Sequence, residues 1–280
     1  MPLKLMYITN SEDVAHIAEE AGVDRIFVDM EYIGKTDRQG GMDTVQSRHT
    51  ADDVRRLAQC LNKSELFVRV NPIHEKTDKY SSSKEEIDEV IEAGADLLML
   101  PYFKTAEEVQ TFVKYVDGRA KTVLLVETPE AAAIAENLVK TPGIDEMFIG
   151  LNDLSLGYGK NFMFELLLDG TVEEVCLKFR KGGIPYGFGG IASLGKGMLP
   201  SEYVIKEHYR LGSTCAILSR SFCRTDQVTD LKEIQKIFET ELPKIRQLEE
   251  ECSVHSQYFW KNRQQVETKI RQICECEDAK

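Results

Sequence analysis

The chain has 280 residues, 42% hydrophobic and 29% charged, with a formal net charge of −12. This composition supports a folded core, and the length suits one α/β barrel with a short appendage. The negative charge and the lack of a basic patch argue against nucleic acid as a partner, and no apolar stretch approaches the length of a membrane span.

The N-terminal segment lacks the basic stretch, apolar run and cleavage site of an export signal. Seven cysteines are scattered along the chain, and only Cys274 and Cys276 are close neighbours. A C-x-C pair without further ligands does not make a zinc site, and scattered thiols are typical of a reducing compartment. We therefore expect a cytoplasmic protein.

Short apolar runs recur along the chain and predict parallel strands covered on both faces. They are residues 3–8, 25–30, 65–70, 96–101, 122–127, 146–151, 185–191 and 215–219. Between them lie helical patterns with start signals. A hydroxyl residue stands three positions before a glutamate at Ser83, Thr105 and Thr171. This spacing predicts capping boxes, in which the two side chains accept hydrogen bonds from free amides at a helix start.

Strand followed by helix, eight times over, predicts a (β/α)8 TIM barrel rather than an open sheet. An open doubly wound sheet usually carries a glycine-rich loop after its first strand, where this chain has TNSED. We expect a barrel catalytic domain over residues 1–250 and an extra C-terminal helical extension over 251–280. The extension has one apolar helix face, which packs either on its own barrel or on a neighbouring subunit: Phe259, Val266, Ile270 and Ile273.

Polar side chains stand at the carboxyl ends of the predicted strands, where barrel enzymes place their catalytic groups. They are Asp29, Glu31, Arg69, Glu127, Asn152 and Asp153. Carboxylates without a cysteine or histidine cluster suit Mg²⁺ or Mn²⁺. A cation held by two carboxylates keeps positions open for a 2-oxo acid, and Arg69 adds positive charge where negative charge develops. The alternative is a structural ion-pair network.

The long polar segment over residues 32–49 follows the second strand, on the same face of the barrel. It carries Lys35, Arg38 and Arg48, which either grip an anionic second half of the substrate or lie in solvent. Among these, Arg48 is our predicted substrate-binding residue.

Three segments are similar to signature segments of the HpcH/HpaI aldolase/citrate lyase family. They are FVRVN (67–71), LLVETPEA (124–131) and FIGLNDLS (148–155), and the resemblance extends over about residues 3–222. It implies a pyruvate-type TIM barrel that makes or breaks a carbon–carbon bond next to an enolate. It also implies assembly as a homo-oligomer, a trimer or hexamer.

The resemblance assigns roles residue by residue. Glu127 and Asp153 match the ligands of Mg²⁺ or Mn²⁺, and Arg69 matches the arginine beside the enolate oxygen. Backbone amides near Asn152 and Asp153 match those that receive the substrate carboxylate.

The residue after the strand-2 glutamate departs from the family pattern, as does Leu125, where the aldolases often have a glutamine. The hydroxy-oxo-acid aldolases carry an acid–base histidine directly after the strand-2 glutamate, whereas this chain has Tyr32 after Glu31. His74, His49 and Tyr32 are the candidates to replace it, with Tyr32 requiring a depressed pKa. We predict catalytic roles for Arg69, Glu31, His74 and His49.

The predicted function is that of a metal-dependent aldolase or lyase acting on a small-molecule 2-oxo acid, with no nucleic acid or membrane partner. Two alternatives remain open: an inactive barrel that only binds, and an enolate enzyme that decarboxylates or rearranges its substrate without aldol cleavage.

Overall fold

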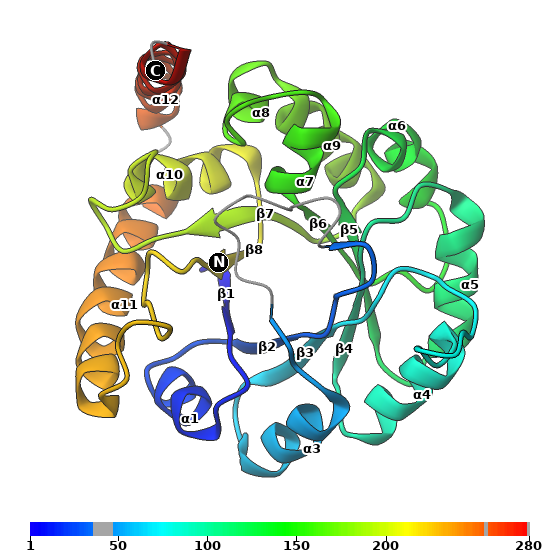
Figure 1. Cartoon of the computed structure of the whole chain (residues 1–280). Helices are drawn as coiled ribbons and strands as arrows, with labels where there is room; N and C mark the ends of the chain where they lie inside the picture. Colours follow the sequence, from blue (N-terminus) through cyan, green and yellow to red (C-terminus); the bar gives the residue numbers. More distant parts are fainter. Residues whose placement is uncertain (36–46, 255–256, 279–280) are drawn as a thin grey trace.

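The computed structural model describes residues 1–35, 47–254 and 257–278. Its strands pair in parallel and close a barrel in chain order, with β8 returning to β1. Figure 1 shows the barrel enclosed by the helices that connect the strands. The strands are β1 (Lys4–Ile8), β2 (Arg25–Asp29), β3 (Glu65–Arg69), β4 (Leu97–Leu100), β5 (Lys121–Val126), β6 (Glu146–Ile149), β7 (Tyr186–Ile191) and β8 (Cys215–Leu218). The predicted TIM barrel and all eight predicted strands are confirmed.

The helices between the strands cover the outside of the barrel, and further helices follow β8. The helices are α1 (Glu12–Glu20), α3 (Ala51–Cys60), α4 (Ser83–Glu92), α5 (Ala106–Val116), α6 (Pro129–Leu138), α7 (Leu151–Gly157), α8 (Glu165–Leu168), α9 (Thr171–Gly182), α10 (Ser201–Leu211), α11 (Leu231–Val254) and α12 (Tyr258–Asp278). Their apolar stripes and the outward-facing strand residues form one continuous core between the two layers.

The start signals of three helices were predicted with mixed success. The capping box at Thr105 is confirmed. In α4 the box lies one residue earlier than predicted, at Ser82 and Glu85. The box predicted at Thr171 is wrong, because Gly170 precedes α9 with a φ of 89° and no side chain caps this helix. The hydroxyl–glutamate spacing alone does not locate the first helical residue.

The inside of the barrel is layered along its axis. Arg25 lies at the amino ends of the strands, fully buried, with its guanidinium 5.7 Å from the ring centre of Phe67. Phe67 stacks on Phe27 at 4.7 Å, and on the far side of this pair the Arg69 guanidinium lies 5.9 Å from the Phe27 ring. The barrel interior is therefore a packed core with an arginine at each end.

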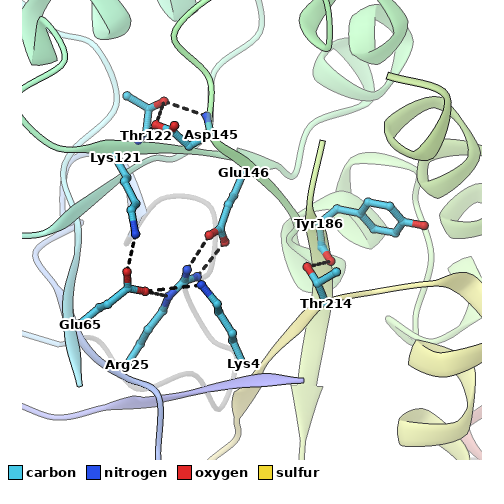
Figure 2. A network of polar contacts seen from close by, with 9 residues as sticks. All are labelled: Lys4, Arg25, Glu65, Lys121, Thr122, Asp145, Glu146, Tyr186 and Thr214. Atoms are coloured by element: carbon cyan, nitrogen blue, oxygen red, sulfur yellow. Dashed lines mark hydrogen bonds and ion pairs between the residues drawn. The ribbon is translucent and has the colours of Figure 1, made fainter. Parts of the chain in front are cut away.

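Arg25 anchors the ion-pair network at the amino ends of the strands, which Figure 2 shows from close by. Its guanidinium donates to both carboxylate oxygens of Glu146, at 2.7 and 2.5 Å, and to Glu65 at 2.9 Å. Lys121 reaches Glu65 at 2.5 Å, and Lys4 approaches it at 3.8 Å. This network joins β1, β2, β3, β5 and β6 at the end opposite the candidate site.

Steric crowding explains why β7 is rich in glycine. Its pairing with β8 shifts register between Gly187 and Gly190. A Cβ atom at Gly187 would lie 2.3 Å from the carbonyl oxygen of Cys215, and Gly189 has a φ of 52°. Both observations fit the tight bend that a glycine-rich strand permits.

The C-terminal helix α12 stands outside the ring of helices, beside α10 (Figure 1). It contacts α10 and α8 of the same chain, burying Val266 and Ile270, and Asn262 donates to Glu207 on α10 at 2.8 Å. Docking of this helix on a second copy of the chain stays a prediction. Among the residues with described positions, no helix is both long and apolar enough to cross a membrane.

Candidate active site

Asp29 and Arg69 form the best-defined pair at the carboxyl ends of the strands. They are register partners at the ends of β2 and β3. The Arg69 guanidinium donates from Nε to Oδ1 and from Nη2 to Oδ2 of Asp29, both at 2.8 Å. This two-point contact fixes the plane of the guanidinium. Burial alone would raise the pKa of Asp29, but the charges of Arg69 and Lys35 outweigh burial and hold that pKa well below its usual range.

Glu31 lies beside this pair, two residues after β2. Its side chain is fully buried, with Oε2 3.3 Å from Arg69 Nη1 and 3.6 Å from Lys35 Nζ. The backbone amide of Glu31 donates to Asp29 Oδ1 at 3.2 Å. Sequence reasoning placed Glu31 in the site, but it left open whether Lys35 contacts the substrate or lies in solvent.

Glu127 follows β5 and is buried, at 4% exposure. Its Oε1 accepts a hydrogen bond from the backbone amide of Tyr102 at 2.9 Å, and Tyr102 adopts a φ of 48°. A Cβ atom at Gly150 would lie only 2.7 Å from Glu127 Oε2. The glycine after β6 therefore leaves room for the Glu127 carboxylate.

Asp153 comes from the first turn of α7 and is also buried. Burial raises the pKa of Glu127 well above its usual value, and the nearby Glu31 and Asp153 carboxylates add to the rise, against the opposing charge of Arg69. Buried carboxylates that interact out of water repel each other unless a cation or a proton lies among them. An oxygen-only donor set of this kind fits a hard divalent ion such as Mg²⁺ or Mn²⁺.

The fit of Glu127 beneath Gly150 can be tested. Gly150→Ala is expected to lower Mn²⁺ affinity about 10- to 100-fold, because the new methyl group displaces the Glu127 carboxylate. Isothermal titration with Mn²⁺ measures this. Gly182→Ala is the matched control: its methyl group would crowd Val139 at 2.5 Å between α9 and α6, which affects stability alone. Equal Mn²⁺ affinity in Gly150→Ala and wild type would contradict the placement of Glu127.

Both predicted histidines are held by the protein backbone. His49 Nδ1 accepts from the Asp29 amide at 3.0 Å, so its neutral ring carries the proton on Nε2. Burial lowers the pKa of His49, outweighing the opposite effect of Asp29. His74 Nδ1 lies 2.7 Å from the carbonyl oxygen of Pro72, and its Nε2 lies 2.8 Å from that of Ser81. The Nδ1 lone pair of His49 is thus engaged, and both ring nitrogens of His74 lie within hydrogen-bond distance of protein oxygens, Nδ1 also of Ser83 Oγ at 3.0 Å.

Tyr32 turns toward the segment after β3. Its ring lies 5.3 Å from that of Tyr80, and burial, followed by the charge of Glu86, raises its pKa. The phenol therefore stays protonated, opposite to the depressed pKa that a base would require. Asn71 holds this segment: its Oδ1 accepts from the Tyr32 amide at 3.0 Å, while its Nδ2 donates to Glu86 at 2.8 Å.

The other predicted residues lie nearer the surface. Arg48 is exposed, and Asn152 is half-buried at the start of α7, where its carbonyl accepts from Ser155 Oγ at 2.7 Å. Arg38 lies outside the described residues. Sequence reasoning missed Tyr102 and Glu86. Tyr102 contacts Glu127 through its backbone amide, and Glu86 is a helix residue that turns toward a loop. Neither feature leaves a motif in the sequence.

Comparisons with known proteins bear on the family and the fold. A family model described as HpcH/HpaI aldolase/citrate lyase matches residues 4–184. The fold is similar to that of an HpcH/HpaI aldolase/citrate lyase family protein from Burkholderia cenocepacia J2315, with 17% identity and a TM-score of 0.61 over 84% of this chain and 95% of that chain. It is also similar to an HpcH/HpaI aldolase from Desulfitobacterium hafniense DCB-2, with 14% identity and a TM-score of 0.60 over 84% and 93%.

A third similar structure is the citrate lyase beta subunit of M. tuberculosis in complex with oxaloacetate and magnesium. It shares 14% identity with this chain and has a TM-score of 0.53, over 85% of this chain and 97% of that chain. At these identities the likenesses show the fold. No curated protein matches the chain.

Proposed function

The chain belongs to the HpcH/HpaI aldolase/citrate lyase family, and from this premise we propose that it is a metal-dependent carbon–carbon lyase acting on a 2-oxo acid. One observation carries the proposal: Glu31 and Glu127 are buried near Arg69, and Asp153 is buried near Glu127. The complex of the citrate lyase beta subunit with oxaloacetate and magnesium supports the same ligand chemistry.

Glu127 and Asp153 would hold the divalent cation, Mg²⁺ or Mn²⁺. When bound, it supplies Lewis-acid stabilisation of an oxygen on which negative charge develops. The Tyr102 amide keeps one oxygen of Glu127 in place, and Gly150 leaves space around the other. These contacts orient the ligand before any ion arrives, which is the usual role of groups behind a metal ligand.

Arg69 would stabilise the negative charge that forms on the substrate oxygen when the carbon–carbon bond breaks. Its two bonds to Asp29 prevent the guanidinium from rotating away. The half-buried Asn152 and the backbone at Asp153 would receive the substrate carboxylate. The exposed Arg48 would meet the distal half of the substrate, where an anionic group suits it.

Glu31 is the acid–base group that this geometry favours for aldol cleavage. Its carboxylate is buried among Arg69, Lys35 and Glu127, whereas His49 and His74 are engaged by backbone groups. The two histidines would instead hold the ends of β2 and β3 in place.

The engagement of His49 and His74 by backbone groups favours a second candidate function, decarboxylation of a 2-oxo diacid. Loss of CO2 leaves an enolate without removal of a hydroxyl proton, so it needs no imidazole base. Product analysis with oxaloacetate separates the two functions. Formation of pyruvate and CO2 when no aldehyde acceptor is present indicates decarboxylation. A barrel that only binds would yield no product from either class of substrate.

The proposed enolate chemistry predicts that the methyl protons of pyruvate exchange with solvent deuterium only when the metal is present. NMR in D2O measures this exchange. Arg69→Met is expected to slow this exchange about 10²- to 10³-fold, because one preorganised charge-stabilising group is lost. Arg55→Met, at an exposed arginine of α3, is the control and should exchange at the wild-type rate. Wild-type exchange that proceeds equally with a chelator present would refute the proposal.

A further inference from the structure

Lys35 is a buried lysine that the proposed reaction has not yet used. Its side chain is 5% exposed, although it belongs to the polar segment after β2. The Nζ atom donates to Asp29 Oδ2 at 2.8 Å and lies 3.6 Å from Glu31 Oε2. A buried lysine is costly unless it is paired, so these two carboxylates account for its position.

Asp29 lies between two cations as a result. Its Oδ2 accepts from both Arg69 Nη2 and Lys35 Nζ, each at 2.8 Å. Glu31 Oε2 is approached by the same two cations. Lys35 and Arg69 therefore hold this pair of carboxylates together, and Glu31 faces Glu127 from a fixed position.

Formal charge gives Lys35 a second role. Among the described residues, the charged side chains that interact with Glu127 or pair with Asp29 and Glu31 are four carboxylates, Asp29, Glu31, Glu127 and Asp153, and two cations, Arg69 and Lys35. Their formal charge is −2, which one divalent cation balances. Without Lys35 the charge would be −3, and a bound 2-oxo acid would add a further negative charge.

We propose that Lys35 is a positioning residue of this site: it holds Asp29 and Glu31 in place and sets the site charge so that a divalent cation and an anionic substrate bind together. The inference rests on the proposed function. It predicts opposite changes in the affinities for the two ligands, because removing a positive charge strengthens the attraction for a cation and weakens that for an anion.

The test compares Lys35→Met, Lys35→Arg and the control Lys76→Met. Lys76 lies exposed in the segment between β3 and α4 and pairs with Glu85 of α4. Its replacement by methionine changes the net charge by the same amount as Lys35→Met. Isothermal titration measures Mn²⁺ alone, and then pyruvate at saturating Mn²⁺. Lys35→Met is expected to bind Mn²⁺ about three- to tenfold more tightly and pyruvate about tenfold more weakly than wild type. Lys35→Arg and Lys76→Met should stay near wild type in both titrations.

Other outcomes overturn the inference in distinguishable ways. Weaker binding of both ligands to Lys35→Met would show that Lys35 only supports the fold, and unchanged binding of both would show no role. Wild type that binds Mn²⁺ but not pyruvate would contradict the proposed function, while the Mn²⁺ titrations would still decide on Lys35. Wild type that binds no Mn²⁺ would overturn both.

Discussion

Glu127→Gln is expected to lower Mn²⁺ affinity by at least about 100-fold. The substitution keeps the shape of the side chain and its contact with the Tyr102 amide, but it replaces a charged ligand oxygen with a neutral amide. It also removes one of the buried negative charges that make a cation favourable here. Isothermal titration with Mn²⁺, together with the pyruvate exchange rate, measures the loss.

Glu130→Gln is the matched control for this result. Glu130 lies three residues further along, in the first turn of α6, and its exposed carboxylate pairs with Lys104. The same chemical change there should leave Mn²⁺ affinity within about twofold of wild type, since exposed charges act weakly through water. Equal affinities in wild type and Glu127→Gln would place the metal elsewhere.

Arg25→Met is expected to cost about 3–5 kcal/mol of unfolding free energy, the largest stability effect that we predict. Its removal leaves Glu146, which is 8% exposed, without the guanidinium that contacts both of its oxygens. An uncompensated buried charge is strongly destabilising, even where the intact pair contributes little. Urea unfolding followed by circular dichroism measures the change.

Two further variants identify the cause of the Arg25 effect. Adding Glu146→Gln to Arg25→Met removes the stranded charge and should recover part of the lost stability. Arg55→Met, whose partner Asp52 is exposed, should change the unfolding free energy by less than about 1 kcal/mol. An Arg25→Met protein as stable as wild type would mean that the network at the amino ends contributes nothing.

The architecture could be predicted from the sequence because its signals are local and repeated. Each strand is a short apolar run, and each following segment has helical spacing, so the eightfold alternation determines the barrel. The errors arose where one sequence pattern was compatible with more than one helix start. At Thr171 the hydroxyl–glutamate spacing matched a capping box, but Gly170 begins the helix in a left-handed conformation.

The site could be predicted only as far as strand ends determine it. Arg69 and Glu127 follow apolar runs, so their place at the carboxyl ends of a barrel follows from the topology. The environment of His49 and His74 does not, because it depends on which backbone groups meet each ring. Lys35 was visible only as a charge in a polar segment, and its burial against Asp29 is a property of the folded chain.

The most direct test of the central claim is titration of pyruvate into the protein with and without Mn²⁺. If Glu127 and Asp153 hold a cation that receives a 2-oxo acid, pyruvate will bind only when Mn²⁺ is present, and Glu127→Gln will abolish that binding. Pyruvate that binds equally well in a chelator, or that fails to bind at saturating Mn²⁺, would contradict the account.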